Sequence, residues 1–205
     1  MRNTRTIIAA VLTVLAAAIG AAQAKDAADT DDFARRLFAA KSIEQKTYAC
    51  FVRTYDATHL AHHRKQKVSA MKLLIAVDKP PEDAELHYVF RVGIKLRNRK
   101  PGYASDGDCG HAEVLAKKDG GIQVSCGGDC GGSGMSIALG PDDKSVTVRL
   151  NEIAIWLADN PTDDSAQMEL KGGADDRVFR LDRVSNEICA PLAREGENVA
   201  ASQPD

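Results

Sequence analysis

The clearest pattern of apolar and polar positions along the chain runs from residue 86 to residue 97. Apolar side chains recur at every second position, namely Leu86, Tyr88, Phe90, Val92, Ile94 and Leu96. The opposite face carries His87, Arg91, Lys95 and Arg97. This alternation predicts a β-strand with one buried and one wet face, which is typical of antiparallel sheets because parallel strands are usually apolar on both faces.

Shorter segments with strand character predict further strands. They lie at residues 46–55, 71–77, 122–126, 135–139, 146–150 and 177–181. Turn residues such as Pro80 and Pro81 separate them, and residues 151–157 form either a strand end or a short helical turn. About seven strands without intervening long helices predict a mainly β protein with a single antiparallel domain, either a barrel or a sandwich.

An amphipathic helix is expected before the first strand. Phe33 and Leu37 are four residues apart, as are Ala34 and Phe38, so they share one face of a helix. Thr30 stands at the position of an N-cap. The pattern predicts about three helical turns that end near Lys41 and pack against the sheet.

The first 24 residues have the features of a secretory signal peptide. Arg2 and Arg5 precede an apolar run at residues 7–19, and Ala22-Gln23-Ala24 supplies small residues for cleavage after Ala24. An uncleaved membrane anchor is the alternative. We expect residues 25–193 to form the β domain and residues 194–205 a polar disordered tail.

The expected location is therefore the bacterial cell envelope, either periplasmic or secreted, with no membrane span after cleavage. Without the leader the chain has 25 Lys and Arg against 29 Asp and Glu, a net charge of −4. That balance gives no reason to expect a nucleic-acid partner.

Export makes disulfides the default interpretation of the five cysteines. Cys50 lies in the first predicted strand and Cys189 lies just beyond the last one. If these strands are neighbours, a bridge would fasten the two ends of the domain and stabilise it by roughly 4–5 kcal/mol on the chain-entropy model.

The other three cysteines lie in a glycine-rich region and allow two pairings. A Cys126–Cys130 bridge across a short turn would direct the even positions of the return strand inward, whereas the apolar residues there are the odd ones, Met135, Ile137 and Leu139. That bridge needs a glycine bulge within residues 131–134. Otherwise residues 126–134 form a wider loop and Cys109 pairs with Cys126 or Cys130, which is the arrangement we favour.

Two groups of residues offer metal ligands as an alternative. Cys109, His111, Cys126 and Cys130 have the chemistry of a zinc or copper site, although their spacing lacks two close ligand pairs. His59, His62 and His63 would share a face of a helical turn. The basic residues that follow them oppose cation binding, so we expect no metal and no cofactor.

Two carboxylate-rich segments, Ser105–Asp108 and Ala174–Asp176, are interpreted as turns because calcium would need more ligands. No nucleophile elbow, phosphate loop or dinucleotide fingerprint appears. The sequence thus favours a non-enzymatic binding or interaction module for an unknown protein or small molecule. A periplasmic zinc- or copper-binding protein and a secreted enzyme are the alternatives.

Overall fold

The computed structural model describes residues 31–79, 85–112, 123–127, 134–160 and 167–200. A short helix at residues 31–38 precedes the strands, and α2 (Ala57–His62) connects the first two. The strands are β1 (Thr47–Thr54), β2 (Val68–Asp78), β3 (His87–Leu96), β4 (Gly102–Ala112), β5 (Gln123–Gly127), β6 (Met135–Leu139), β7 (Ser145–Leu150), β8 (Glu152–Leu157), β9 (Met168–Lys171) and β10 (Val178–Val184). A 3₁₀ helix, η2, spans Asn186–Leu192.

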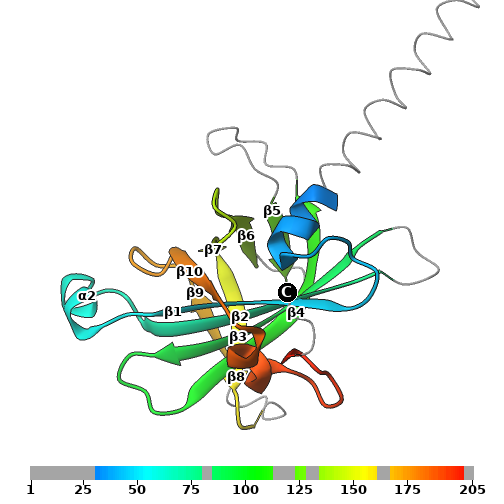
Figure 1. The fold of residues 1–205 in the computed structure, drawn as a ribbon. Helices are drawn as coiled ribbons and strands as arrows, with labels where there is room; N and C mark the ends of the chain where they lie inside the picture. The colour runs from blue at the N-terminus through cyan, green and yellow to red at the C-terminus, as the bar shows by residue number, and fades with distance from the viewer. Residues whose placement is uncertain (1–30, 80–84, 113–122, 128–133, 161–166, 201–205) are drawn as a thin grey trace, which may run out of the picture.

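Eight of these strands close into an antiparallel barrel (Figure 1). Their order is β3-β2-β1-β10-β7-β6-β5-β4, and the pairing of β3 with β4 closes the ring. β8 continues from β7, pairs with the start of β4 and carries β9 on its other side. The predicted antiparallel β fold with an N-terminal helix is confirmed, and the alternative between sandwich and barrel is decided by the β3–β4 pairing.

Buried side chains occupy the interior of the barrel. Each strand turns its alternate residues inward, and a single cluster of buried residues unites strands β1 to β10. Its largest members are below 2% exposed and include Phe51, Phe90, Phe179, Tyr88 and Met71. Small barrels of about eight strands commonly fill their interior in this way, so the outer surface and the barrel ends remain for binding.

Strand β4 was missed in the sequence, because Ser105–Asp108 was interpreted as a turn. Its inward positions include the small residues Ser105 and Gly107, so the strand lacks an apolar alternation. A Cβ on Gly107 would lie 2.9 Å from the Phe90 ring and 2.4 Å from the Gly127 carbonyl oxygen. The glycine therefore makes room for a large aromatic side chain and for the neighbouring strand β5.

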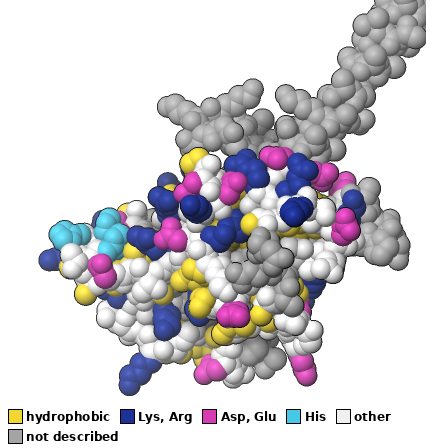
Figure 2. Space-filling model, viewed as in Figure 1, with side chains coloured by type: hydrophobic (Ala, Val, Ile, Leu, Met, Phe, Trp, Pro, Cys, Tyr) yellow, Lys and Arg dark blue, Asp and Glu magenta, His cyan; other side chains and the backbone are white. Residues whose placement is uncertain are grey.

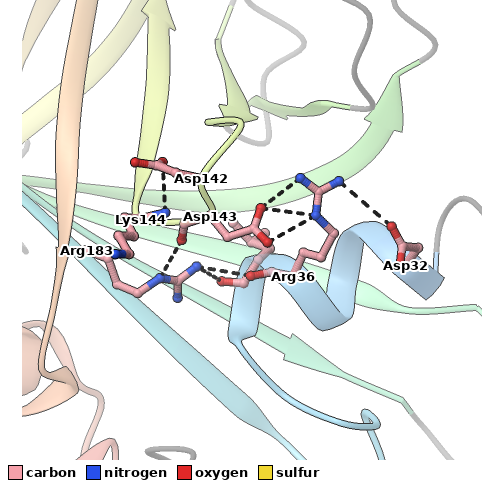
Figure 3. Close-up of polar contacts among 7 residues, drawn as sticks. Asp32, Arg36, Asp142, Asp143, Lys144 and Arg183 are labelled. Atoms are coloured by element: carbon pink, nitrogen blue, oxygen red, sulfur yellow. Dashed lines mark hydrogen bonds and ion pairs between the residues drawn. The ribbon is translucent and has the colours of Figure 1, made fainter.

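The N-terminal helix closes one end of the barrel, where Phe33, Leu37 and Phe38 join the core. Figure 3 shows how its last turn is held at the β6–β7 turn. Arg36 donates hydrogen bonds to Asp143, the shortest at 2.8 Å. Arg183 donates to the backbone carbonyls of Arg36 and Leu37 at 3.1 and 3.0 Å. These bonds satisfy carbonyls that a helix end leaves unpaired.

The C-terminal segment packs on the outside of β1, β2 and β3. Cys189 of η2 and Val199 are 0% and 2% exposed in a second buried cluster, which includes Leu74. Glu197 receives hydrogen bonds from both terminal nitrogens of the Arg91 guanidinium. Residues 194–200, which the sequence assigned to a polar disordered tail, lie on the barrel and are held there by the Glu197 carboxylate and by Val199.

The predicted signal peptide and its cleavage after Ala24 lie outside the described residues, as do residues 201–205. Among the helices that the structure describes, none is long and apolar enough to cross a bilayer.

Candidate functional site

The structure forms two disulfides from four of the predicted cysteines. Cys50 is bonded to Cys189, with their Cα atoms 5.8 Å apart, and β1 is a direct neighbour of β10, as the sequence prediction required. Cys109 is bonded to Cys126, its partner directly across β4 and β5. Cys130 lies outside the described residues.

The register of β5 and β6 explains why the second bridge takes this form. Cys126 lies opposite Met135 and Val124 lies opposite Ile137, so the apolar residues of both strands point inward without a bulge. The predicted pairing of Cys109 with Cys126 or Cys130 is therefore confirmed for Cys126, and the loop predicted after Cys126 lies largely outside the described residues. A Cβ on Gly134 would lie 1.7 Å from the carbonyl oxygen of Cys126, so only glycine permits this close approach after the loop.

The alternative zinc or copper site is inconsistent with this pairing, because a disulfide removes the thiolates that would bind the metal. His111 pairs with Val124 in the β4–β5 ladder. Within the ranges that the structure describes, His, Cys, Asp and Glu form no group of three or more that could hold a metal ion.

The other candidate group lies at α2, the short helix that connects β1 to β2 (Figure 1). His59 and His62 belong to this helix, and His63 is its C-cap. The His59 ring stacks against Tyr55 and His63, with centroid distances of 4.5 and 4.2 Å. His59 Nε2 lies 3.0 Å from Gln66 Oε1, and His62 Nδ1 lies 2.8 Å from the Thr58 carbonyl oxygen. These contacts give the rings a structural role in holding the α2 turn.

A cleft of about 790 Å³ lies beside α2, at the end of the barrel opposite the N-terminal helix. One wall is the connection from α2 to β2, a second is the β3–β4 turn, and a third comes from β8 and β9. Five basic residues line the cleft against a single acidic residue, Glu169, and they are Arg64, Lys65, Lys67, Arg97 and Arg99. The chain as a whole has a net charge of −2, so positive charge is concentrated here.

None of the five basic side chains has a carboxylate partner within 4 Å among the described residues. Arg97 donates to the Leu60 carbonyl oxygen at 2.9 Å, and Arg99 donates to the Tyr103 hydroxyl at 3.1 Å. Both bonds fix the guanidinium groups in place without neutralising them. Arg64, Lys65 and Lys67 are exposed. Figure 2 shows basic side chains beside the histidines of α2.

The backbone around the cleft is positioned by carboxylates of the β9–β10 loop. Asp176 is 0% exposed, and its carboxylate accepts hydrogen bonds from the backbone N–H groups of Lys67 and Val68 at 2.7 and 3.1 Å. Asp175 accepts from the backbone N–H of Lys65 at 3.1 Å. The predicted turn at these two residues thus acts as a support for the basic wall.

The cleft was not predicted from the sequence, although the two basic runs that line it can be recognised there. Residues 64–67 and 97–100 are two basic runs, Arg-Lys-Gln-Lys and Arg-Asn-Arg-Lys. Asn98 has a φ of 61°, in the left-handed region that asparagine tolerates, and it turns the chain between β3 and β4. The pairing of β2 with β3 then brings the two runs to one end of the barrel.

No protein-family model, curated protein or solved structure matches the chain.

Proposed function

We propose that this protein is an exported, non-enzymatic binding domain that holds an anionic ligand in the basic cleft. The observation that carries the proposal is the set of five cleft cations without carboxylate partners among the described residues. Unneutralised cations in a confined space repel one another, and an anionic ligand relieves that repulsion.

The size of the cleft supports a ligand larger than a single inorganic anion. Its volume of about 790 Å³ lies within the roughly 300–1,000 Å³ that is usual for small-molecule sites. Arg97 and Arg99 each use one terminal nitrogen in the protein contact described above, which leaves guanidinium N–H groups for carboxylate or phosphate oxygens.

The proposed location is the periplasm or the exterior of the cell. Two disulfides are compatible with an oxidising compartment, and the leader predicted at residues 1–24 would direct the chain there. The large buried side chains inside the barrel favour the cleft at its end as the binding site.

The test is isothermal titration calorimetry of the protein with citrate and with tripolyphosphate, at 20 and 200 mM NaCl. We expect binding that weakens at the higher salt concentration. The triple substitution Arg64→Glu, Lys65→Glu and Lys67→Glu should weaken it at least tenfold. These side chains are exposed, so their substitution should leave the fold intact.

The matched control reverses three exposed cations at the opposite end of the barrel, Lys41→Glu, Lys79→Glu and Lys144→Glu. It changes the net charge by the same amount and should leave most of the affinity intact. Equal losses in both triple variants, or no binding of either anion by the wild type, would show that the cleft is not an anion site.

A further inference from the structure

Among the described strands, none pairs with the second edge of β9, a strand that lies beside the basic cleft. It lies at the end of the sheet order, and among the described strands it pairs only with β8. Three of its residues, Met168, Glu169 and Leu170, line the cleft. A strand edge with free backbone groups is a template on which another chain can add.

The ladder between β8 and β9 shows which backbone groups point away from β8. The N–H of Gly172 donates to the carbonyl oxygen of Asn151 at 2.7 Å, and Glu152 lies opposite Lys171 in the same register. Hydrogen-bonded and non-bonded pairs alternate in antiparallel strands. The N–H and C=O groups of Glu169 and Lys171 are therefore directed to the free edge.

We propose that an extended, acidic polypeptide segment binds by adding as a strand to the free edge of β9, with its carboxylates directed to the cleft cations. This inference rests on the proposed function and names its ligand class. Backbone hydrogen bonds to β9 supply one part of the recognition, and charge complementarity with the cleft supplies the other.

A second copy of this chain fits the edge less well than an acidic segment. Pairing two β9 edges would bring two basic clefts together, and their positive charges would repel. The short strand also carries Lys171, a residue type that natural edge strands use against self-association. Sedimentation should therefore find a monomer, whereas a dimer that Lys171→Pro dissolves would overturn the proposal.

The decisive experiment uses fluorescein-labelled nine-residue peptides in which glutamate alternates with valine or threonine, measured by fluorescence anisotropy. Two derivatives carry N-methyl groups, one at every odd position and the other at every even position. A strand uses the N–H groups of only one edge to pair with its neighbour. We expect one derivative to bind at least tenfold more weakly than the parent peptide and the other to bind nearly as well.

The protein side is tested with Lys171→Pro against Lys171→Ala. Proline removes an N–H that faces the free edge and leaves the β8–β9 ladder intact. Both variants lose the ion pair between Lys171 and Glu169 of the cleft, so they should bind tripolyphosphate alike. Only Lys171→Pro should bind the peptide more weakly than Lys171→Ala does. Circular dichroism checks that both variants are folded.

The outcomes separate this inference from the proposed function. If the two methylated peptides bind alike while tripolyphosphate still binds, strand addition is wrong and the anion site stands. If the parent peptide, citrate and tripolyphosphate all fail to bind, both proposals fail.

Discussion

The ion pair between Arg91 and Glu197 determines whether the C-terminal segment stays on the barrel. The Glu197 carboxylate accepts hydrogen bonds from Arg91, from Lys46 Nζ at 2.8 Å and from the backbone N–H of Arg194 at 2.9 Å. The side chains of Arg91 and Glu197 are only 8% and 11% exposed. Glu197→Gln removes the negative charge while keeping the size of the side chain.

The expected loss of unfolding free energy at pH 7 is about 2–4 kcal/mol. Removing one partner of a fully buried pair costs roughly 3–5 kcal/mol, since the other charge stays buried without compensation. The lower range applies here because the pair keeps some contact with water, and the glutamine oxygen still accepts one hydrogen bond.

The pH dependence follows from the pKa of Glu197, which hydrogen bonds from Arg91 hold well below the usual range of a carboxyl group. An unfolded glutamate titrates near pH ~4.3. The stabilisation is therefore complete above that pH and decreases as the pH falls below it, by at most about 1.4 kcal/mol per unit for one proton. The difference between wild type and Glu197→Gln should be large at pH 7 and clearly smaller at pH 3.

Urea denaturation with intact disulfides measures both quantities. Trp156 fluorescence reports on β8 and circular dichroism reports on the whole sheet. Glu195→Gln is the matched control, because this exposed glutamate lies in the same segment and should change stability by less than ~0.5 kcal/mol. A loss in Glu197→Gln no larger than in Glu195→Gln, or a difference that stays constant down to pH 3, would refute the reasoning.

Three further predictions concern the supports of the fold. Asp176→Asn should destabilise the protein by about 2–3 kcal/mol in urea denaturation, because the buried carboxylate accepts hydrogen bonds from two backbone N–H groups. The control Asp175→Asn should cost less, because Asp175 is partly exposed. In a Cys130→Ser background, replacing Cys50 and Cys189 by serine should cost about 3–5 kcal/mol, measured by the same method, and an unchanged urea midpoint would contradict this. Thiol titration of the wild-type chain in urea without reductant should find one free thiol, because four of its five cysteines are bonded; three thiols would exclude one bridge.

The strands with a period-two pattern could be predicted because the pattern reflects burial directly. The inward set from Tyr88 to Leu96 is indeed buried. The outward residue Arg91 is buried as well, since the C-terminal segment covers that face. Alternation along a strand predicts which of its faces packs on the barrel core. It does not show whether a segment distant in the sequence covers the opposite face.

The same alternation reduced the number of plausible cysteine pairings. The parity of Cys126 against Met135, Ile137 and Leu139 already opposed the local bridge to Cys130, and the register of β5 and β6 agrees with that parity. Cys109 could be chosen as the partner of Cys126 only once β4 was known to pair with β5. The sequence did not predict β4, because its small inward residues give no apolar alternation.

The sequence by itself determined the antiparallel β class and the N-terminal helix, because each depends on a periodicity along the chain. The bridge between Cys50 and Cys189 could be proposed from the sequence, but it needed the pairing of β1 with β10. Only the tertiary structure decided that the sheet closes, that β9 presents an edge and that two basic runs meet in one cleft. These features depend on pairing between distant segments, and a strand's own residues do not specify which neighbour it finds.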